Sequence, residues 1–93
     1  MLSKPLFLKV KTREKSLYEG EVNSITSFND KGKFDVLRGH ANFISLIKDE
    51  LIIRELNGNI KEIPGVVDGL LKVVGDNIEI YLGVREGFTK TGI

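Results

Sequence analysis

Apolar and polar residues alternate along two stretches of the chain, one near the N-terminus and one near residue 80. Leu6, Leu8 and Val10 alternate with Lys9 and Lys11, with Phe7 as the exception, and residues 78–82 (IEIYL) repeat the same period of two. Successive side chains of a β-strand point to opposite faces, so this period is typical of strands with one buried face. The pattern therefore predicts two half-buried strands.

Turn-forming residues separate the apolar segments. Residues 29–32 (NDKG), Asn57-Gly58 and residues 75–77 (GDN) each lie between apolar stretches. Asn-Gly favours the positive φ angles of a two-residue hairpin turn. Gly20 predicts a bulge or tight turn within its segment, and Pro64 limits the following strand to a sheet edge or ends it. Short segments between such turns predict an all-β fold, a sandwich or a barrel.

Residues 41–56 (ANFISLIKDELIIREL) fit two structures equally well. Phe43, Ile47 and Leu51 are four residues apart, as on the apolar face of a helix. The charged residues 48–50 could instead divide the segment into two isoleucine-rich strands. The residues alone leave both possibilities open.

Composition limits the classes of protein to consider. The chain has 93 residues, enough for one domain, and a formal net charge of +1, which argues against nucleic acid as the main partner. It contains no cysteine, which excludes disulfides and thiolate metal sites. We expect no secretory signal and no membrane-spanning helix, so that any membrane association would be peripheral, through a partner.

Residues suited to catalysis or cofactor binding are scarce. His40 is the only histidine, and one histidine without further ligands does not form a usual zinc site. The acidic residues are scattered among lysines, and we find no nucleophile or phosphate-binding motif. We therefore expect no catalytic residue, metal, nucleotide or other cofactor. A local hydrogen bond within a turn is the simplest role for His40.

Three segments, in order, resemble the epsilon subunit of F-type ATP synthase, which is called delta in mitochondria. FDVLRGHANF (residues 34–43) resembles the family's Val-Leu-Pro-Gly-His-Ala-Pro signature. LFLKVKTREKSLYEGEVNSI (residues 6–25) resembles its first hairpin, and GVVDGLLKVVGDNIEIYL (residues 65–82) resembles its Gly-Gly-containing segment. The similarity covers residues 6 to about 83.

The resemblance implies a fold and a set of partners. The family fold is a flattened antiparallel β-sandwich, here over residues 1–83, in which residues 43–56 form two strands. The expected function is that of a non-catalytic central-stalk subunit, which binds the gamma subunit and the c-ring and helps couple ion translocation to ATP synthesis. Such a subunit lies peripherally on the cytoplasmic face of the bacterial membrane. Residues 84–93 would be a tail, without the family's C-terminal helical hairpin.

The resemblance also suggests which residues face each partner. Lys33, Arg38, Gly39 and His40 would form a basic tip toward the c-ring, with Gly39 at positive φ. Thr12 and Leu51 would face the gamma subunit. Apolar residues beyond the needs of a thin core are further candidates for that face, or else part of the core: Phe7, Ile52 and Val74.

The sequence departs from the family pattern at several positions. Arg38 and Asn42 replace prolines, Lys33 replaces a frequent acidic residue, and Asp68 replaces the first glycine of the Gly-Gly pair.

The alternative function is a free-standing all-β protein-interaction module, which the fold alone would not distinguish from a stalk subunit.

Overall fold

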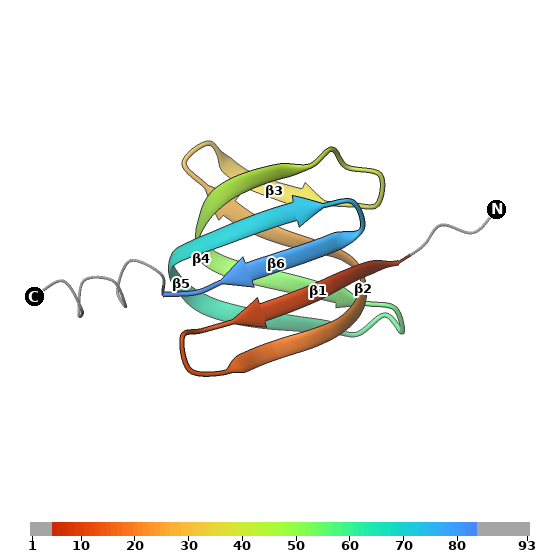
Figure 1. Cartoon of the computed structure of the whole chain (residues 1–93), viewed down its shortest axis with the longest axis horizontal. Coiled ribbons are helices and arrows are strands. Elements are labelled where there is room, and N and C mark those ends of the chain that lie inside the picture. The colour runs from red at the N-terminus through yellow and green to blue at the C-terminus, as the bar shows by residue number, and fades with distance from the viewer. Residues whose placement is uncertain (1–4, 84–93) are drawn as a thin grey trace, which may run out of the picture.

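The computed structural model describes residues 5–83, and all its regular elements are β-strands (Figure 1). The strands are β1 (Leu6–Lys11), β2 (Ser16–Asn29), β3 (Gly32–Val36), β4 (Phe43–Glu55), β5 (Ile60–Val74) and β6 (Asn77–Tyr81). The predicted all-β fold is confirmed, and the helical alternative for residues 41–56 is excluded. Nowhere in residues 5–83 is there a helix long and apolar enough to cross a membrane. The predicted tail, residues 84–93, lies outside the described residues.

The strands close into a flattened ring. Their order is β1-β6-β5-β4-β2-β3, and an additional β1–β2 pairing closes the first five strands on themselves, with β3 attached beside β2. All pairs are antiparallel except β1 and β6, which run parallel. That parallel pair is an addition to the antiparallel sandwich expected from the family. Figure 1 shows the ring flattened into two layers, with β1 and β6 in the front layer.

The turns lie where the sequence predicts them. At the β4–β5 turn, Gly58 has a φ of +92° and its N–H donates to the Glu55 carbonyl at 3.0 Å. The Asn57 side chain accepts a hydrogen bond from the N–H of Asn59 at 3.0 Å. Turns also occupy residues 30–31 and 75–76. The hairpin therefore forms at Asn-Gly as predicted, but residues 56–59 connect the strands and only Gly58 of the pair has positive φ, so the predicted two-residue turn is wrong in type.

The predicted division of residues 43–56 into two strands is wrong in one respect. β4 runs without interruption, but its register with β5 shifts on both sides of Asp49, which has a φ of +73°. Opposite this point, Gly65 and Asp68 also have positive φ, at +70° and +53°. A bulge of this kind bends a strand and increases its twist without ending it. The charged residues thus mark a bend of the ring.

Two further predictions about single residues have different outcomes. β2 passes through Gly20 in regular register with Leu8. Its register shifts on either side, between Ser16 and Tyr18 opposite β1, and between Val22 and Ser24 and between Thr26 and Phe28 opposite β4. The predicted irregularity is therefore present in this segment but does not fall on Gly20 itself. Pro64 lies inside β5, in the half that pairs only with β4, because β6 pairs with residues 70–74. This half of β5 is a local sheet edge, as Pro64 predicts.

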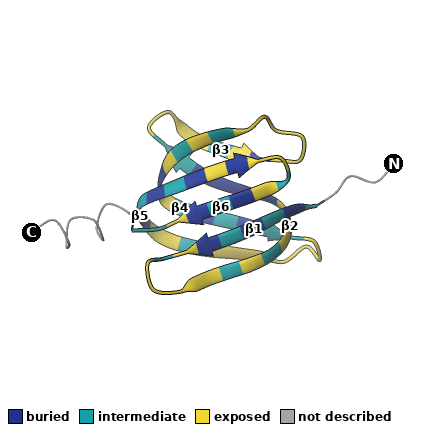
Figure 2. Ribbon diagram, viewed as in Figure 1, coloured by how far each residue is buried: buried dark blue, intermediate teal, exposed yellow. Residues whose placement is uncertain are grey.

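The core lies between the two layers, and Figure 2 marks the buried positions along the strands. Fourteen apolar side chains are buried there: Leu6, Leu8, Val10, Val22, Ile25, Val36, Ile47, Leu51, Ile53, Val66, Leu71, Val73, Ile78 and Ile80. Every strand contributes to this set, so the core ties the ring together. It also determines which side chains remain available on the two outer faces.

Candidate partner-binding surfaces

The loop between β3 and β4 holds His40 in a compact turn. The N–H of Leu37 donates to His40 Nδ1 at 3.2 Å, and the His40 N–H donates to the Leu37 carbonyl at 3.3 Å. The imidazole also meets the edge of Phe43, with ring centroids 6.0 Å apart. His40 nevertheless remains exposed, as does Arg38. The predicted local hydrogen bond is present, and the ring is still accessible to a partner.

Asn42 anchors this loop to the neighbouring β5–β6 turn. Its side-chain oxygen accepts a hydrogen bond from the N–H of Gly75 at 2.8 Å. A side-chain amide provides this acceptor, whereas the proline usual in the family would not. The sequence flagged Asn42 only as a departure. The structure gives it a role in holding the loop on the sandwich.

Lys33 does not share a tip with Arg38, Gly39 and His40. It lies beside the β2–β3 turn, whereas the other three follow the opposite end of β3. Five extended residues span roughly 17 Å, so the two groups lie at different ends of the sandwich. The predicted single tip is therefore two separate sites, each of them exposed.

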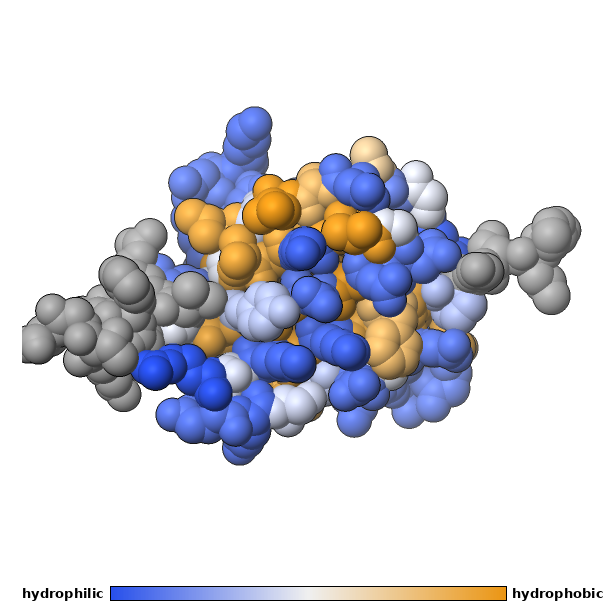
Figure 3. All heavy atoms as spheres, in the orientation of Figure 1, coloured by the Kyte–Doolittle hydropathy of each residue, from blue (hydrophilic) through white to orange (hydrophobic). Residues whose placement is uncertain are grey.

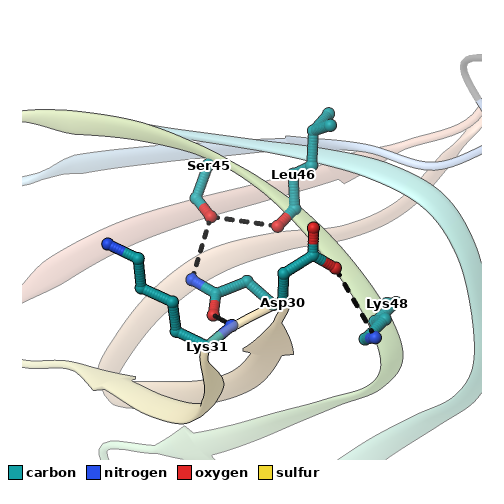
Figure 4. A network of polar contacts seen from close by, with 6 residues as sticks. Asp30, Lys31, Ser45, Leu46 and Lys48 are labelled. Carbon is teal, nitrogen blue, oxygen red and sulfur yellow. Dashed lines mark hydrogen bonds and ion pairs between the residues drawn. The ribbon is translucent and has the colours of Figure 1, made fainter.

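Polar contacts fix the β2–β3 turn against β4 (Figure 4). The side chain of Asn29 accepts from the Lys31 N–H at 2.8 Å and donates to Ser45 Oγ at 3.2 Å. Ser45 Oγ in turn donates to a β4 carbonyl at 2.9 Å. Lys48 Nζ lies 3.6 Å from a carboxylate oxygen of Asp30. These contacts hold the end of the sandwich that carries Lys33.

The two residues expected to face the gamma subunit have very different surroundings. Leu51 is 0% exposed and belongs to the core, so its side chain cannot lie on a binding surface. Its placement on that surface is therefore corrected. Thr12 is partly exposed at the β1–β2 turn, where its Oγ1 accepts from the N–H groups of Glu14 and Lys15, each at 3.2 Å. Its proposed contact with a partner stays a prediction.

An apolar strip lies on the outer face of β4, β5 and β6, and of its residues only Val74 was a candidate from the sequence. It consists of Ile44, Leu46, Leu70, Val74 and Tyr81. Ile44 and Leu46 are 66% and 62% exposed, and Leu46 pairs with Leu70, which in turn pairs with Tyr81. Figure 3 shows apolar patches over this part of the front layer, with hydrophilic residues between them.

The sequence left open whether the other apolar candidates belong to a partner surface or to the core. Val74 is exposed and belongs to the strip, whereas Phe7 and Ile52 are half-buried. Lys72, opposite Ile44 on the same face, interrupts the strip. Exposed apolar side chains grouped in this way on a small domain are typical of a protein interface. The strip is therefore the strongest candidate site in the described part of the chain. Within residues 5–83, no group of three or more His, Cys, Asp or Glu side chains could hold a metal ion.

Gly39 allows the His40 turn to form, because its φ of +83° disfavours residues with a Cβ. No heavy atom lies within 4 Å of the position that a Cβ would take. We therefore expect Gly39→Ala to lower the free energy of unfolding by about 1 kcal/mol through backbone strain alone. Urea denaturation measures this change. An unchanged midpoint would contradict the strain argument.

Tyr18 gives a prediction about pH. Burial and a 2.6 Å hydrogen bond from its hydroxyl to Glu55 Oε2 raise the pKa of Tyr18 to about 12. The folded state thus favours the neutral phenol, and this stabilisation is present below pH 10 and lost as the pH rises from 10 to 12. In a Tyr81→Phe background, ultraviolet absorbance should show Tyr18 ionising near pH 12, and Glu55→Gln should lower that pKa. Ionisation near pH 10 with Glu55 intact would contradict this.

Comparisons with known proteins agree with this architecture. Residues 5–86 match the family model of the ATP synthase delta/epsilon chain β-sandwich domain. The ATP synthase epsilon chain of Campylobacter jejuni subsp. doylei is 35% identical over 71 residues, which cover 76% of this chain and 55% of that protein. That of Wolinella succinogenes is 32% identical over 75 residues, covering 81% of this chain and 57% of that protein. The chain thus spans about half the length of these relatives.

Solved structures share the fold at low sequence identity. A chain of the Euglena gracilis mitochondrial ATP synthase superposes with a TM-score of 0.79 at 16% identity, covering 88% of this chain and 52% of that chain. A chain of the Tetrahymena thermophila mitochondrial ATP synthase central stalk and c-ring gives a TM-score of 0.67 at 14% identity, covering 88% and 66%. With the family model matching most of its length, the chain belongs to the ATP synthase delta/epsilon chain β-sandwich family.

Proposed function

We propose that this chain is a non-catalytic central-stalk subunit of the epsilon type in a rotary F-type ATP synthase. It binds the gamma subunit and the c-ring and helps couple ion translocation to ATP synthesis. It is held peripherally at the cytoplasmic face of a bacterial membrane through that complex. The similarity to bacterial epsilon chains supports this assignment.

The apolar strip is the observation that carries the gamma-binding part of the proposal. A stalk subunit without catalytic residues acts by holding its neighbours, and it needs an apolar surface for that purpose. Ile44 and Leu46 extend outward from the same strand whose inward residues build the core. We assign the strip to the gamma subunit, in place of Leu51. The exposed His40 loop and the Lys33 end remain the candidate contacts with the c-ring.

Binding to the gamma subunit tests this assignment. We expect the double variant Ile44→Asp, Leu46→Asp to bind the gamma subunit at least about tenfold more weakly, because the interface would bury two carboxylates without partners. Affinity would be measured by calorimetry with the gamma subunit of the same organism. Ile60→Asp is the matched control, since Ile60 is 58% exposed on β5 but outside the strip.

The outcomes separate the two candidate functions. Tight binding by the native chain and by Ile60→Asp, with loss in the double variant, supports the stalk assignment. A native chain that fails to bind the gamma subunit would favour the free-standing interaction module. Equal binding by all three proteins would leave the stalk assignment in place and remove the strip from the interface.

A further inference from the structure

β3 has one side of its backbone without a partner strand. It is the last strand in the sheet order, and among the described residues it pairs with β2 alone. Asn29 and Gly32 flank the two-residue turn as a hydrogen-bonded pair, and such pairs alternate along an antiparallel ladder. The N–H and C=O groups of Lys33 and Asp35 therefore point away from β2, toward the open edge. An edge of this kind can accept a strand from another chain.

β3 offers a more regular open edge than β5 does. The register between β3 and β2 runs through all five residues of β3 without a shift. The local edge of β5 is interrupted by Pro64 and by the positive φ of Gly65. Prolines and irregular backbone are common means by which an edge avoids another chain. On β3 the remaining obstacle is charge, because a lysine on one edge repels a lysine on another.

The side chains along β3 remove this obstacle when the other chain is a copy of the same protein. Lys33 and Asp35 lie on the outer face, and Phe34 between them packs against the core. In an antiparallel pair of two copies centred on Phe34, Lys33 of each copy lies opposite Asp35 of the other. Both opposed pairs are hydrogen-bonded pairs, because the backbone groups of these two residues point outward. One register therefore brings the backbone groups and the opposite charges together.

The charged groups of this edge are available to a second copy. The Asp35 carboxylate accepts a hydrogen bond from the hydroxyl of Thr26, which in turn accepts one from the Arg54 guanidinium at 2.6 Å. Thr26 is fully buried, whereas Asp35 stays exposed. Lys33 is exposed as well, and it has no ion-pair partner within residues 5–83. A carboxylate that is already ordered loses little conformational entropy when it pairs.

We propose that the β3 edge pairs with the β3 edge of a second copy of this chain, antiparallel and centred on Phe34, with Lys33 opposite Asp35. This inference concerns the chain outside its complex and does not depend on the stalk assignment. The paired strands are short and their charges exposed, so the dimer is weak and forms at high protein concentration. The Lys33 end of one copy lies beside the His40 loop of the other. Self-association therefore competes with any partner that binds these two sites.

Exchange of charges between copies tests this pairing by sedimentation velocity, at protein concentrations up to about 1 mM. We expect the native chain to pass from monomer to dimer as the concentration rises. Lys33→Asp and Asp35→Lys each place like charges opposite one another, and each should raise the dimer dissociation constant at least about tenfold. An equimolar mixture of these two variants should dimerise again, because each Asp then meets a Lys. The double variant Lys33→Asp, Asp35→Lys should dimerise by itself for the same reason.

Two further variants serve as controls. Lys61→Asp makes the same charge change at an exposed position of β5, and it should dimerise like the native chain. If Asp35→Lys does not fold, Lys33→Pro takes its place. It removes an outward N–H together with the charge, without breaking a hydrogen bond to β2, and it should weaken the dimer as Lys33→Asp does.

Each outcome supports or overturns the pairing. Loss of the dimer in the single variants and its return in their mixture supports β3 pairing in this register. A native chain that stays monomeric at every concentration overturns the proposal, as does a dimer that is equally strong in Lys33→Asp. A mixture that stays monomeric shows that Lys33 and Asp35 do not face each other. Binding to the gamma subunit is measured separately, so the stalk assignment stands or fails by itself.

Discussion

Leu51→Ala is expected to lower the free energy of unfolding by about 2–5 kcal/mol. The side chain is fully buried in the core beside other aliphatic residues, so its truncation loses apolar burial and leaves a cavity. A domain of this size has a stability of only about 5–15 kcal/mol, so the variant should melt at a markedly lower temperature. Chemical denaturation monitored by circular dichroism measures the change.

Leu46→Ala is the matched control, because it makes the same truncation on the same strand at a residue that is 62% exposed. Its free energy of unfolding should stay within about 0.5 kcal/mol of the native value. Its affinity for the gamma subunit should fall instead. A Leu51→Ala variant as stable as the native chain would show that Leu51 lies outside the core and would restore its place on the partner surface.

β4 explains why the residues alone left both a helix and strands open for this segment. The residues of β4 that face the core are Ile47, Leu51 and Ile53, at odd positions, as expected for a strand. Ile44 and Leu46, at even positions, are apolar as well, because they form a surface. With apolar residues on both faces, the period of two is hidden and a helical spacing appears among them. The ambiguity is itself a sign of an interface.

Other features depend on contacts between distant segments. The turns at residues 57–58 and 75–77 follow from local backbone preferences, so the sequence predicted them. The parallel pairing of β1 with β6 and the hydrogen bond from Gly75 to Asn42 arise only when the ring closes. The sequence suggested that Lys33 and His40 share one tip. They lie apart because β3 forms a strand between them.

Gly69→Ala is the second substitution for which we expect a large loss of stability. It tests how closely β4 and β5 pack at their bend. A Cβ at Gly69 would lie 2.7 Å from Cγ1 of Ile47 and 3.2 Å from Cγ1 of Val66. Both neighbours belong to the buried core, so they cannot move away into solvent. We expect Gly69→Ala to lower the free energy of unfolding by about 1–3 kcal/mol through overpacking. Thermal and chemical denaturation both measure it.

Gly20→Ala separates this steric effect from the general behaviour of glycine in a strand. A Cβ at Gly20 meets only the Tyr18 side chain, at 3.8 Å, so this variant should be as stable as the native chain or up to about 1 kcal/mol more stable.

The clash between a Cβ at Gly69 and the Ile47 side chain predicts a further result. In the double variant Gly69→Ala, Ile47→Ala, the loss of stability should be smaller than the sum of the two single losses, because the truncated side chain makes room for the new methyl group. Strict additivity would mean that the two residues do not touch, and that the bend is held by the backbone of Asp49, Gly65 and Asp68 alone.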